Sequence, residues 1–397
     1  MAAARHVLIN GLSIGGGGGV TVGKELWRNL ALARPDCRFT LALVEGHPLQ
    51  REITTDGMPA NTEIRRAPCD ALNRLRRSRY EKGPLVDWAK QNGVDAVLQL
   101  NGMVVPGMPA PTLAHMQDPF PYRPVAWNGW KDRIVSALRR RQHAYAMRNA
   151  ACVGWTSAYL RDVICGALGF RPARGEVFYN GVPPEWAQRV SGGMEPLDGR
   201  PWEIMTLSNV APYKRQDLVM RALPLLLRRP GLEKLVYHLV GFCADCERVR
   251  HEALARELGV LDHVVIHSRV SEEEMARRLR SARCCVQMSV CESFGIPAIE
   301  AMSFGTPVVA SDCCAMPETC GDAGVLSPVD DAAALADNIA RVLTDARLAQ
   351  TLRERGARRV PLFRWDQTAA RMADVLDELA GRSVPAEPVV AAKSLQK

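Results

Sequence analysis

Short runs of β-branched and aliphatic residues alternate with longer stretches of helical periodicity along most of this chain of 397 residues. This rhythm is typical of βαβ units, in which helices cover both faces of a parallel sheet. In the first half the predicted strands are His6–Asn10, Arg38–Val44, Ala96–Leu100, Thr112–Met116 and Ala151–Gly154. In the second half they are Trp202–Leu207, Leu235–Val240, His263–His267, Arg283–Ser289, Pro307–Ala310 and Gly324–Ser327.

A stretch rich in glycine and proline, Ser191–Pro201, separates the two sets of strands. Because such composition marks a connection between folded units, we expect an α/β protein with two Rossmann-like domains. Open parallel sheets bind ligands beyond the carboxyl ends of their strands, so the two sheets are expected to face a shared cleft.

Basic residues are concentrated in the first half of the chain. Residues 1–190 contain 25 Lys and Arg against 15 Asp and Glu, whereas residues 191–397 contain 26 against 28. Much of the excess lies in Arg74–Lys82 and Lys131–Arg148. Such clusters attract polyanions, namely nucleic acid, anionic lipid headgroups or phosphorylated substrates. No nucleic-acid-binding motif accompanies the charge, and we therefore expect no nucleic-acid partner.

The second basic cluster overlaps a predicted helix, Trp127–Arg148. Its apolar residues at helical spacing are Trp130, Ile134, Val135, Ala137 and Leu138. The pattern is typical of a helix at a membrane interface, but a solvated face on an ordinary core helix gives the same pattern. No run of about 18 apolar residues and no signal-peptide pattern occurs. The sequence predicts a cytoplasmic protein, with peripheral contact at the inner face of the cell membrane left open.

The twelve cysteines do not resemble a disulfide framework, because they are spread over a large chain and are often adjacent. Cys243 and Cys246 form one Cys-x-x-Cys pair with His251 nearby. No second pair follows, and ordinary reduced thiols are favoured over half of a zinc site. We expect no metal centre.

A glycine-rich loop, Gly11–Gly19, follows the first predicted strand and precedes a helix predicted at Lys24–Leu32. Backbone N–H groups in such a loop can approach an anion closely, and the helix dipole adds to the attraction. The spacing does not fit a dinucleotide-binding motif, and a P-loop is disfavoured because Glu25 replaces the Ser or Thr that binds magnesium. Gly18 and Gly19 are candidates for contact with phosphate or acceptor, with a structural turn as the alternative.

The densest chemical signal follows the strand predicted at Arg283–Ser289. Glu292 lies in the next loop, and Glu300 is expected in the first turn of a helix that begins near Pro297. Backbone amides between them belong to Ser293, Phe294, Gly295 and Ile296. Two carboxylates that accept hydrogen bonds from hydroxyls, with a row of N–H donors, suit the recognition of a sugar.

Glu292 and Glu300, followed by Ala-Met-x-x-Gly-Thr-Pro-Val-Val-Ala-Ser, resemble the E-x7-E motif of retaining glycosyltransferases with the GT-B fold. The similarity is to the large bacterial family that makes polysaccharides, including lipopolysaccharide, and glycolipids. It covers nearly the whole chain, through Val177–Val182, Ser208–Arg215, Pro317–Glu318, Gly321–Asp322 and Phe363–Trp365. The resemblance implies transfer of a sugar from a nucleotide-diphosphate sugar to a hydroxyl of a glycan, lipid-linked saccharide or glycolipid.

In this resemblance, Glu300 binds the ribose hydroxyls, and Glu292 with the amides of residues 293–296 binds the transferred sugar. Lys214 binds the donor diphosphate and stabilises the charge of the leaving group. His115 is implied to face the donor sugar or the acceptor, with a buried core histidine as the alternative. Asp118 is a further candidate, as a partner or base for the acceptor hydroxyl.

One position departs from the family pattern. Asn209 stands where many members carry an arginine beside the diphosphate. We expect Arg215 or the glycine loop to replace that contact.

The resemblance also implies how the chain is divided. The expected parts are an acceptor-side domain at 1–185, a linker at 186–200, a nucleotide-sugar-binding domain at 201–362, a helix crossing back to the first domain at 363–382 and a mobile tail at 383–397. The donor is expected to be GDP-mannose, with UDP-linked sugars next, and no cofactor is expected. Two other functions stay open, a nucleotide-sugar isomerase or epimerase on the same fold and a non-catalytic carbohydrate-binding protein.

Overall fold

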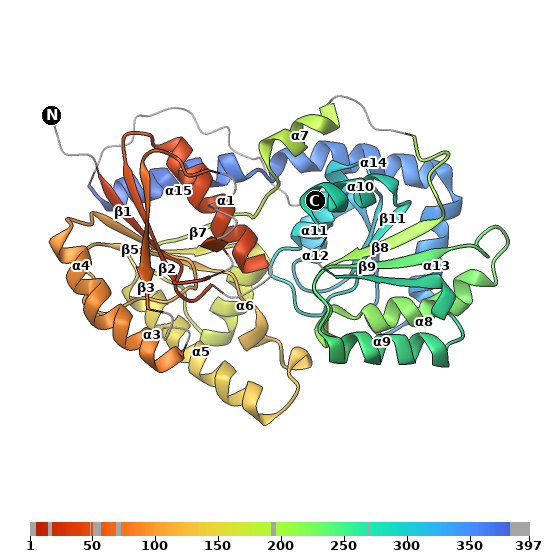
Figure 1. Cartoon of the computed structure of the whole chain (residues 1–397), viewed down its shortest axis with the longest axis horizontal. Helices are drawn as coiled ribbons and strands as arrows, with labels where there is room; N and C mark the ends of the chain where they lie inside the picture. The colour runs from red at the N-terminus through yellow and green to blue at the C-terminus, as the bar shows by residue number, and fades with distance from the viewer. Residues whose placement is uncertain are drawn as a thin grey trace.

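The computed structural model describes residues 5–14, 18–47, 49–50, 57–68, 73–191, 196–268 and 270–381. These residues form two α/β halves that lie side by side along the long axis of the molecule (Figure 1). The expected tail at 383–397 and Gly15–Gly17 of the glycine loop lie outside the described residues.

The first half is built around a parallel sheet of seven strands in the order β3-β2-β1-β4-β5-β6-β7. Its strands are β1 His6–Asn10, β2 Arg38–Val44, β3 Thr62–Ala67, β4 Ala96–Gln99, β5 Thr112–Met116, β6 Cys152–Trp155 and β7 Gly175–Val177. Leu8 of β1 lies opposite Thr40 of β2 on one side and Val97 of β4 on the other. The strand order therefore reverses at β1, which is where ligands bind in sheets of this kind.

The second half repeats this topology in a parallel sheet of six strands, in the order β10-β9-β8-β11-β12-β13. Its strands are β8 Glu203–Leu207, β9 Val236–Val240, β10 Val264–His267, β11 Cys284–Gln287, β12 Val308–Ser311 and β13 Gly324–Ser327. The order reverses at β8, so each half has one such crevice. The two parallel sheets confirm the predicted fold class.

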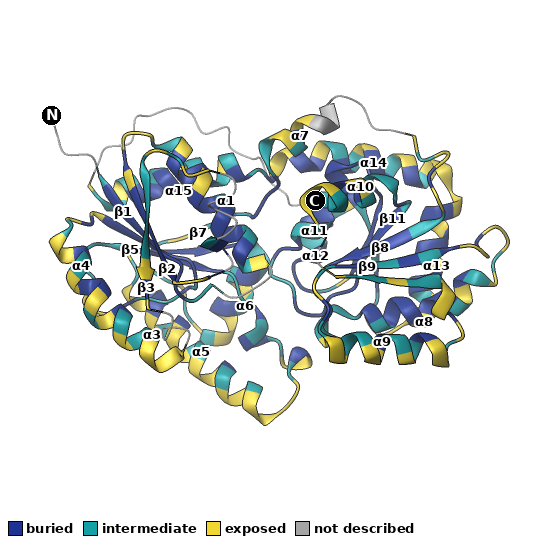
Figure 2. Ribbon diagram, viewed as in Figure 1, coloured by how far each residue is buried: buried dark blue, intermediate teal, exposed yellow. Residues whose placement is uncertain are grey.

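Helices cover both sheets. Those of the first half are α1 Gly18–Ala33, α3 Arg74–Tyr80, α4 Val86–Gln91, α5 Trp130–Asn149 and α6 Ala158–Leu168. Those that follow are α7 Pro184–Ser191, α8 Gln216–Leu227, α9 Asp245–Glu257, α10 Glu272–Ser281, α11 Ile296–Ser303, α12 Met316–Cys320, α13 Ala332–Thr344, α14 Ala346–Arg359 and α15 Trp365–Leu379. In Figure 2 the strands are mostly buried, whereas the outer sides of α3, α5 and α9 are exposed.

The last helix, α15, returns to the first half and packs beside α1 (Figure 1). Trp365 and Met372 belong to the same buried core as Leu26 and Leu30 of α1. At the end of α1, the Arg34 guanidinium pairs with two carboxylates of α15, Asp374 and Asp377. The chain therefore crosses between the halves twice, once after β7 and once before α15.

Two strands, β3 and β7, were not predicted from the sequence. In β3, Glu63, Arg65 and Arg66 interrupt the aliphatic pattern because this strand lies at the edge of the sheet and is half exposed. The other edge strand, β7, has only three residues. The segment expected as a linker at 186–200 begins inside helix α7.

Candidate active site

A cavity of about 600 Å³ lies between the two halves, at the carboxyl ends of both sheets. The loops after the central strands β1, β4, β8 and β11 contribute to its wall, because these strands flank the point where each strand order reverses. Of the predicted site residues, those that line it are Gly18, Gly19, Asp118, Asn209, Lys214, Glu292, Ser293, Phe294, Gly295, Ile296 and Glu300.

Lys214 and Glu292 meet in this cavity although they are far apart in sequence. The lysine ends a short 3-10 helix after β8, and the glutamate lies in the loop between β11 and α11. The Nζ atom of Lys214 donates to Oε2 of Glu292 over 2.6 Å, and both side chains are largely buried. Burial opposes the charged form of Lys214, but the Glu292 carboxylate outweighs it and raises the lysine pKa. The pair thus holds a cation at the wall of the cavity.

The loop after Glu292 turns its backbone toward the cavity. Gly295 has φ +95, and a Cβ atom at that position would lie 2.6 Å from Sδ of Met316, so only glycine fits without rearrangement. The side chain of Phe294 is buried against Tyr179 and Phe363. Phe294 also lines the cavity, together with Ser293, Gly295 and Ile296.

Glu300 lies on α11, one residue beyond the first turn of that helix. The sequence predicted it within the first turn. Burial raises the pKa of Glu300 to about 7, and the carboxylates of Glu272 and Glu25 add to this effect. Near neutral pH this carboxyl group therefore exchanges between its neutral and ionised forms. An ionised carboxylate is a good acceptor for a pair of hydroxyl groups.

The glycine loop leads directly into α1, which begins at Gly18. Gly18 and Gly19 form part of the cavity wall, so first-turn N–H groups of α1 are available there. Lys24 is not at the cavity. Its Nζ donates to Oε1 of Glu272 across the gap between the halves, over 3.3 Å. Burial raises the pKa of the next residue, Glu25, to about 7.

Asp118 lies on the wall formed by the first half, between the cavity and α5. One carboxylate oxygen accepts the N–H of Phe120 over 2.9 Å, and the other accepts from Arg139 of α5 over 3.1 Å. Arg139 also lines the cavity. We did not single it out from the sequence, where it is one of six basic residues in the same cluster. Only the fold shows that it faces Asp118.

His115 is not among the residues that line the cavity. It lies on β5 with all five residues of the strand buried, next to Phe178 and Gly154. Complete burial lowers the pKa of His115 to about 3, so it stays neutral. Its burial favours the alternative of a buried core histidine, and its contact with donor or acceptor stays a prediction.

Arg215 is also not among the residues that line the cavity. Its backbone is left-handed, with φ +55, and its guanidinium pairs with Asp217 on α8 over 3.3 Å. That Arg215 replaces the arginine missing at Asn209 stays a prediction. Among the described residues that line the cavity, the positively charged side chains are those of Lys214 and Arg139.

In the part of the chain that the structure describes, no three His, Cys, Asp or Glu side chains are grouped to hold a metal ion. The same residues contain no helix with the length and hydrophobicity that crossing a bilayer requires.

Comparison with known proteins gives consistent matches. Residues 194–359 match the family model of the glycosyl transferases group 1. A D-inositol 3-phosphate glycosyltransferase from Streptomyces bingchenggensis is 32% identical over 226 residues, which are 51% of this chain and 50% of that protein. An MMP alpha-(1->4)-mannosyltransferase from Mycolicibacterium hassiacum is 38% identical over 138 residues, or 33% of each protein. The chain spans half or less of the length of these curated relatives.

Solved structures extend the likeness over both halves. A glycosyltransferase from Rickettsia africae superposes with a TM-score of 0.75 at 15% identity, covering 96% of this chain and 99% of that one. Anabaena HepE, solved in complex with UDP-glucose, superposes with a TM-score of 0.70 at 19% identity, covering 94% and 99%. Residues 194–359 thus resemble the glycosyl transferases group 1, and the chain as a whole has the two-domain GT-B fold of these solved structures.

Proposed function

We propose that this protein is a glycosyltransferase of the EC 2.4 class that moves a sugar from a nucleotide-diphosphate sugar to an acceptor hydroxyl, with retention of the anomeric configuration. One observation carries the proposal. Lys214, Glu292 and Glu300 converge, with a row of backbone amides, in one cavity at the carboxyl ends of both sheets. A lysine suits a diphosphate, and the carboxylates suit hydroxyl groups.

In this proposal each group has one task. Glu300 accepts hydrogen bonds from the ribose, while Glu292 and the amides of residues 293–296 hold the transferred sugar. Lys214 lies beside the diphosphate. When the bond between the anomeric carbon and the diphosphate oxygen breaks, negative charge grows on that oxygen, and the ammonium group of Lys214 stabilises it. Because the lysine is already in place and largely buried, little reorganisation is needed.

Asp118 is the candidate partner of the acceptor hydroxyl. It lines the cavity from the basic first half, whereas Lys214 and Glu292 line it from the second half. The acceptor proton passes to a leaving phosphate oxygen in a front-face route, or to a carboxylate if a covalent intermediate forms. Both routes retain configuration.

For the donor we prefer GDP-mannose, with UDP-linked sugars next. The match to a protein named as a mannosyltransferase supports the first, and a neighbour solved with UDP-glucose supports the second. Nucleobases are held largely by backbone and apolar contacts. The residues named above therefore do not discriminate between the two.

The acceptor we propose is a glycan or lipid-linked saccharide that carries negative charge. Arg139 lines the cavity, and Arg77 of α3 lies close enough for their charges to interact. Positive side chains thus lead from the cavity toward the outer surface of the first half. An anionic acceptor would be attracted along this path.

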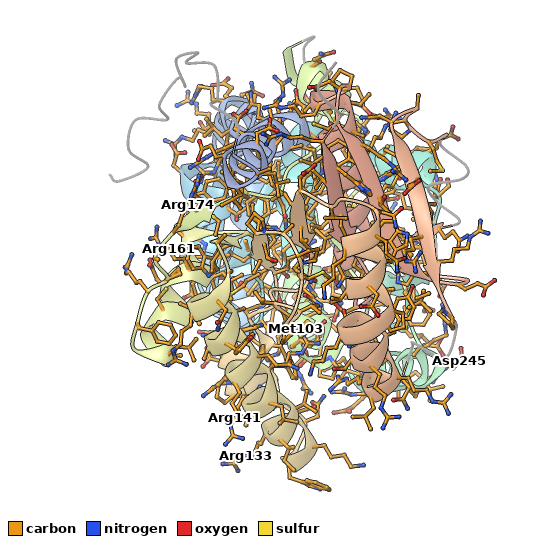
Figure 3. The ribbon with its side chains drawn as sticks, turned by 90° about the vertical axis from the view of Figure 1, so that its left-hand side faces the viewer. Met103, Arg133, Arg141, Arg161, Arg174 and Asp245 are labelled. Atoms are coloured by element: carbon orange, nitrogen blue, oxygen red, sulfur yellow. The ribbon has the colours of Figure 1, made fainter. Side chains whose placement is uncertain are left out.

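The same surface suits peripheral contact with an anionic membrane. Trp130, Ile134 and Leu138, one turn apart on α5, are exposed by 68%, 52% and 52% of their area. Figure 3 shows Arg133 and Arg141 on the same helix, directed away from the body of the protein. Exposed aromatic and aliphatic side chains beside cations favour the boundary between lipid headgroups and acyl chains.

The test is to follow consumption of GDP-mannose and of UDP-glucose with and without candidate acceptors, using Glu292→Gln as the inactive control. A transferase consumes donor quickly only when acceptor is present and forms a product that keeps the anomeric configuration. Conversion of donor alone into another nucleotide sugar would show an isomerase. Binding without consumption of any donor would show a carbohydrate-binding protein.

A further inference from the structure

Two buried hydroxyl groups of the first half hold one carbonyl group of the donor loop. The side-chain hydroxyl of Ser157 donates to the carbonyl oxygen of Ser293 over 2.6 Å, and that of Thr156 donates to the same oxygen over 3.3 Å. Ser157 and Thr156 are fully buried. The loop that lines the cavity in the second half is therefore fixed from the first half.

The helix that Ser157 caps, α6, is also hydrogen-bonded to the second half. Ser157 is the N-cap of α6, and its oxygen accepts the N–H of Leu160 over 3.0 Å. Both carboxylate oxygens of Glu318 on α12 accept N–H groups of the first turn of α6, from Ala158 over 2.8 Å and from Tyr159 over 2.7 Å. A carboxylate at the start of a helix also interacts favourably with the helix dipole. Ser157 thus has little freedom to move relative to the donor loop.

The orientation of the Ser293 carbonyl determines where the next N–H points. In a trans peptide the C=O and N–H bonds of one unit point in opposite directions. No cis peptide bond occurs among the described residues. Since the Ser293 carbonyl points at Ser157 in the first half, the Phe294 N–H points the other way. In the described part of the chain, the Phe294 N–H donates a hydrogen bond to no backbone or side-chain group.

We propose that Ser157, held in place by Glu318, is a positioning residue that aims the Phe294 N–H at the donor. The group that this N–H meets is an oxygen of the β-phosphate or of the sugar attached to it, which the nucleoside monophosphates lack. Glu318 and Ser157 lie outside the cavity wall, so they act through the peptide group and not by touching the donor. This inference rests on the proposed function, because it supposes that a nucleotide sugar occupies the cavity.

The test compares two ligands that share the nucleoside. Ser157→Ala loses the hydroxyl that orients the peptide. Glu318→Gln replaces one of the two acceptor oxygens by an NH2 group, which donates hydrogen bonds and does not accept them. For each protein we would measure the dissociation constants of GDP-mannose and UDP-glucose, and of GMP and UMP, by calorimetry at 20 °C. We expect Ser157→Ala to weaken nucleotide-sugar binding about tenfold, the effect of one lost hydrogen bond, and Glu318→Gln to weaken it several-fold. Binding of the monophosphates should change less than about twofold.

Two controls separate positioning from a loss of stability. Ser157→Thr keeps the hydroxyl and should restore nucleotide-sugar binding. Asp331→Ala removes the N-cap of α13, which accepts the N–H groups of Ala333 and Ala334, and should lower the melting temperature without weakening donor binding. Unchanged nucleotide-sugar binding in Ser157→Ala, or equal weakening of both ligand classes, would overturn the inference. Failure of the unmodified protein to bind any nucleotide sugar would instead overturn the proposed function.

Discussion

Lys214 and Glu292 form an ion pair of 2.6 Å between residues that lie 78 positions apart in the chain. The lysine follows the first strand of the second sheet and the glutamate follows the fourth, yet these strands are neighbours. The opposite charges of the two largely buried side chains compensate each other, so a cation and a carboxylate can share the cavity. The proposed chemistry depends on this pair.

Replacing Lys214 by Ala should reduce kcat by about 100- to 1,000-fold, because the cation that stabilises the leaving diphosphate is lost. The measurement is the initial rate of donor consumption at saturating acceptor. Lys234→Ala, at an exposed position of the same half, is the matched control and should leave kcat unchanged. Activity of Lys214→Ala within tenfold of the unmodified enzyme would contradict the assigned role.

Donor binding should strengthen as the pH rises through about 7, the pKa to which burial raises Glu300. Below that pH the carboxyl group is protonated and is a poorer acceptor for ribose hydroxyls. We expect the dissociation constant of the preferred nucleotide sugar to fall about three- to tenfold between pH 6 and pH 8. In Glu300→Gln the pH dependence should largely disappear. An identical profile in both proteins would assign the titration to another group.

The stability of the protein should depend on Glu25 in a defined pH window. Burial raises its folded-state pKa from 4.5 to about 7, so its contribution to stability is fully present below pH 4.5 and is lost as the pH rises through 7. Glu25→Gln should therefore raise the melting temperature at pH 8, by the equivalent of about 1–3 kcal/mol, and leave it nearly unchanged at pH 4.5. Glu273→Gln, at an exposed position, should do neither. Equal effects of Glu25→Gln at both pH values would refute this account.

The exposed face of α5 should bind anionic membranes. Vesicles of phosphatidylglycerol should retain the protein in a sedimentation assay, whereas vesicles of phosphatidylcholine should not. Replacing Trp130, Ile134 and Leu138 together by Ser should reduce binding about tenfold or more, since these side chains are exposed and their loss does not disturb the core. The control replaces Val249 and Leu261, exposed apolar residues of the second half. Equal binding by both variants would show that α5 is not the contact surface.

Much of the fold could be predicted because central parallel strands are buried on both faces and read as continuous aliphatic runs. The strands β1, β2, β5 and β13 have the predicted bounds. The edge strands β3 and β7 could not be recognised, since one is half exposed and charged and the other is very short. A strand is recognised in the sequence by its run of buried aliphatic residues, and these two edge strands have no such run.

The site was less predictable than the fold. Lys214, Glu292 and Glu300 follow from their motif, and the topology brings them together. His115 lies in the middle of a buried strand, where neighbouring side chains point to opposite faces of the sheet and no motif shows which face is filled by a core. No sequence pattern distinguishes Arg139 from the other basic residues of Lys131–Arg148. Its role depends on Asp118, which lies 21 positions away, and on the direction of α5.

The central claim is that the cavity between the two halves binds a nucleotide sugar, and ligand-induced stabilisation tests it most directly. The measurement is the melting temperature of the unmodified protein and of Glu300→Ala with GDP-, UDP-, ADP- and dTDP-sugars, since a ligand that binds only the folded state raises it. The account predicts a rise with one nucleotide, GDP-mannose first, that is lost in the variant. No rise with any of the four, or the same rise in both proteins, would contradict it.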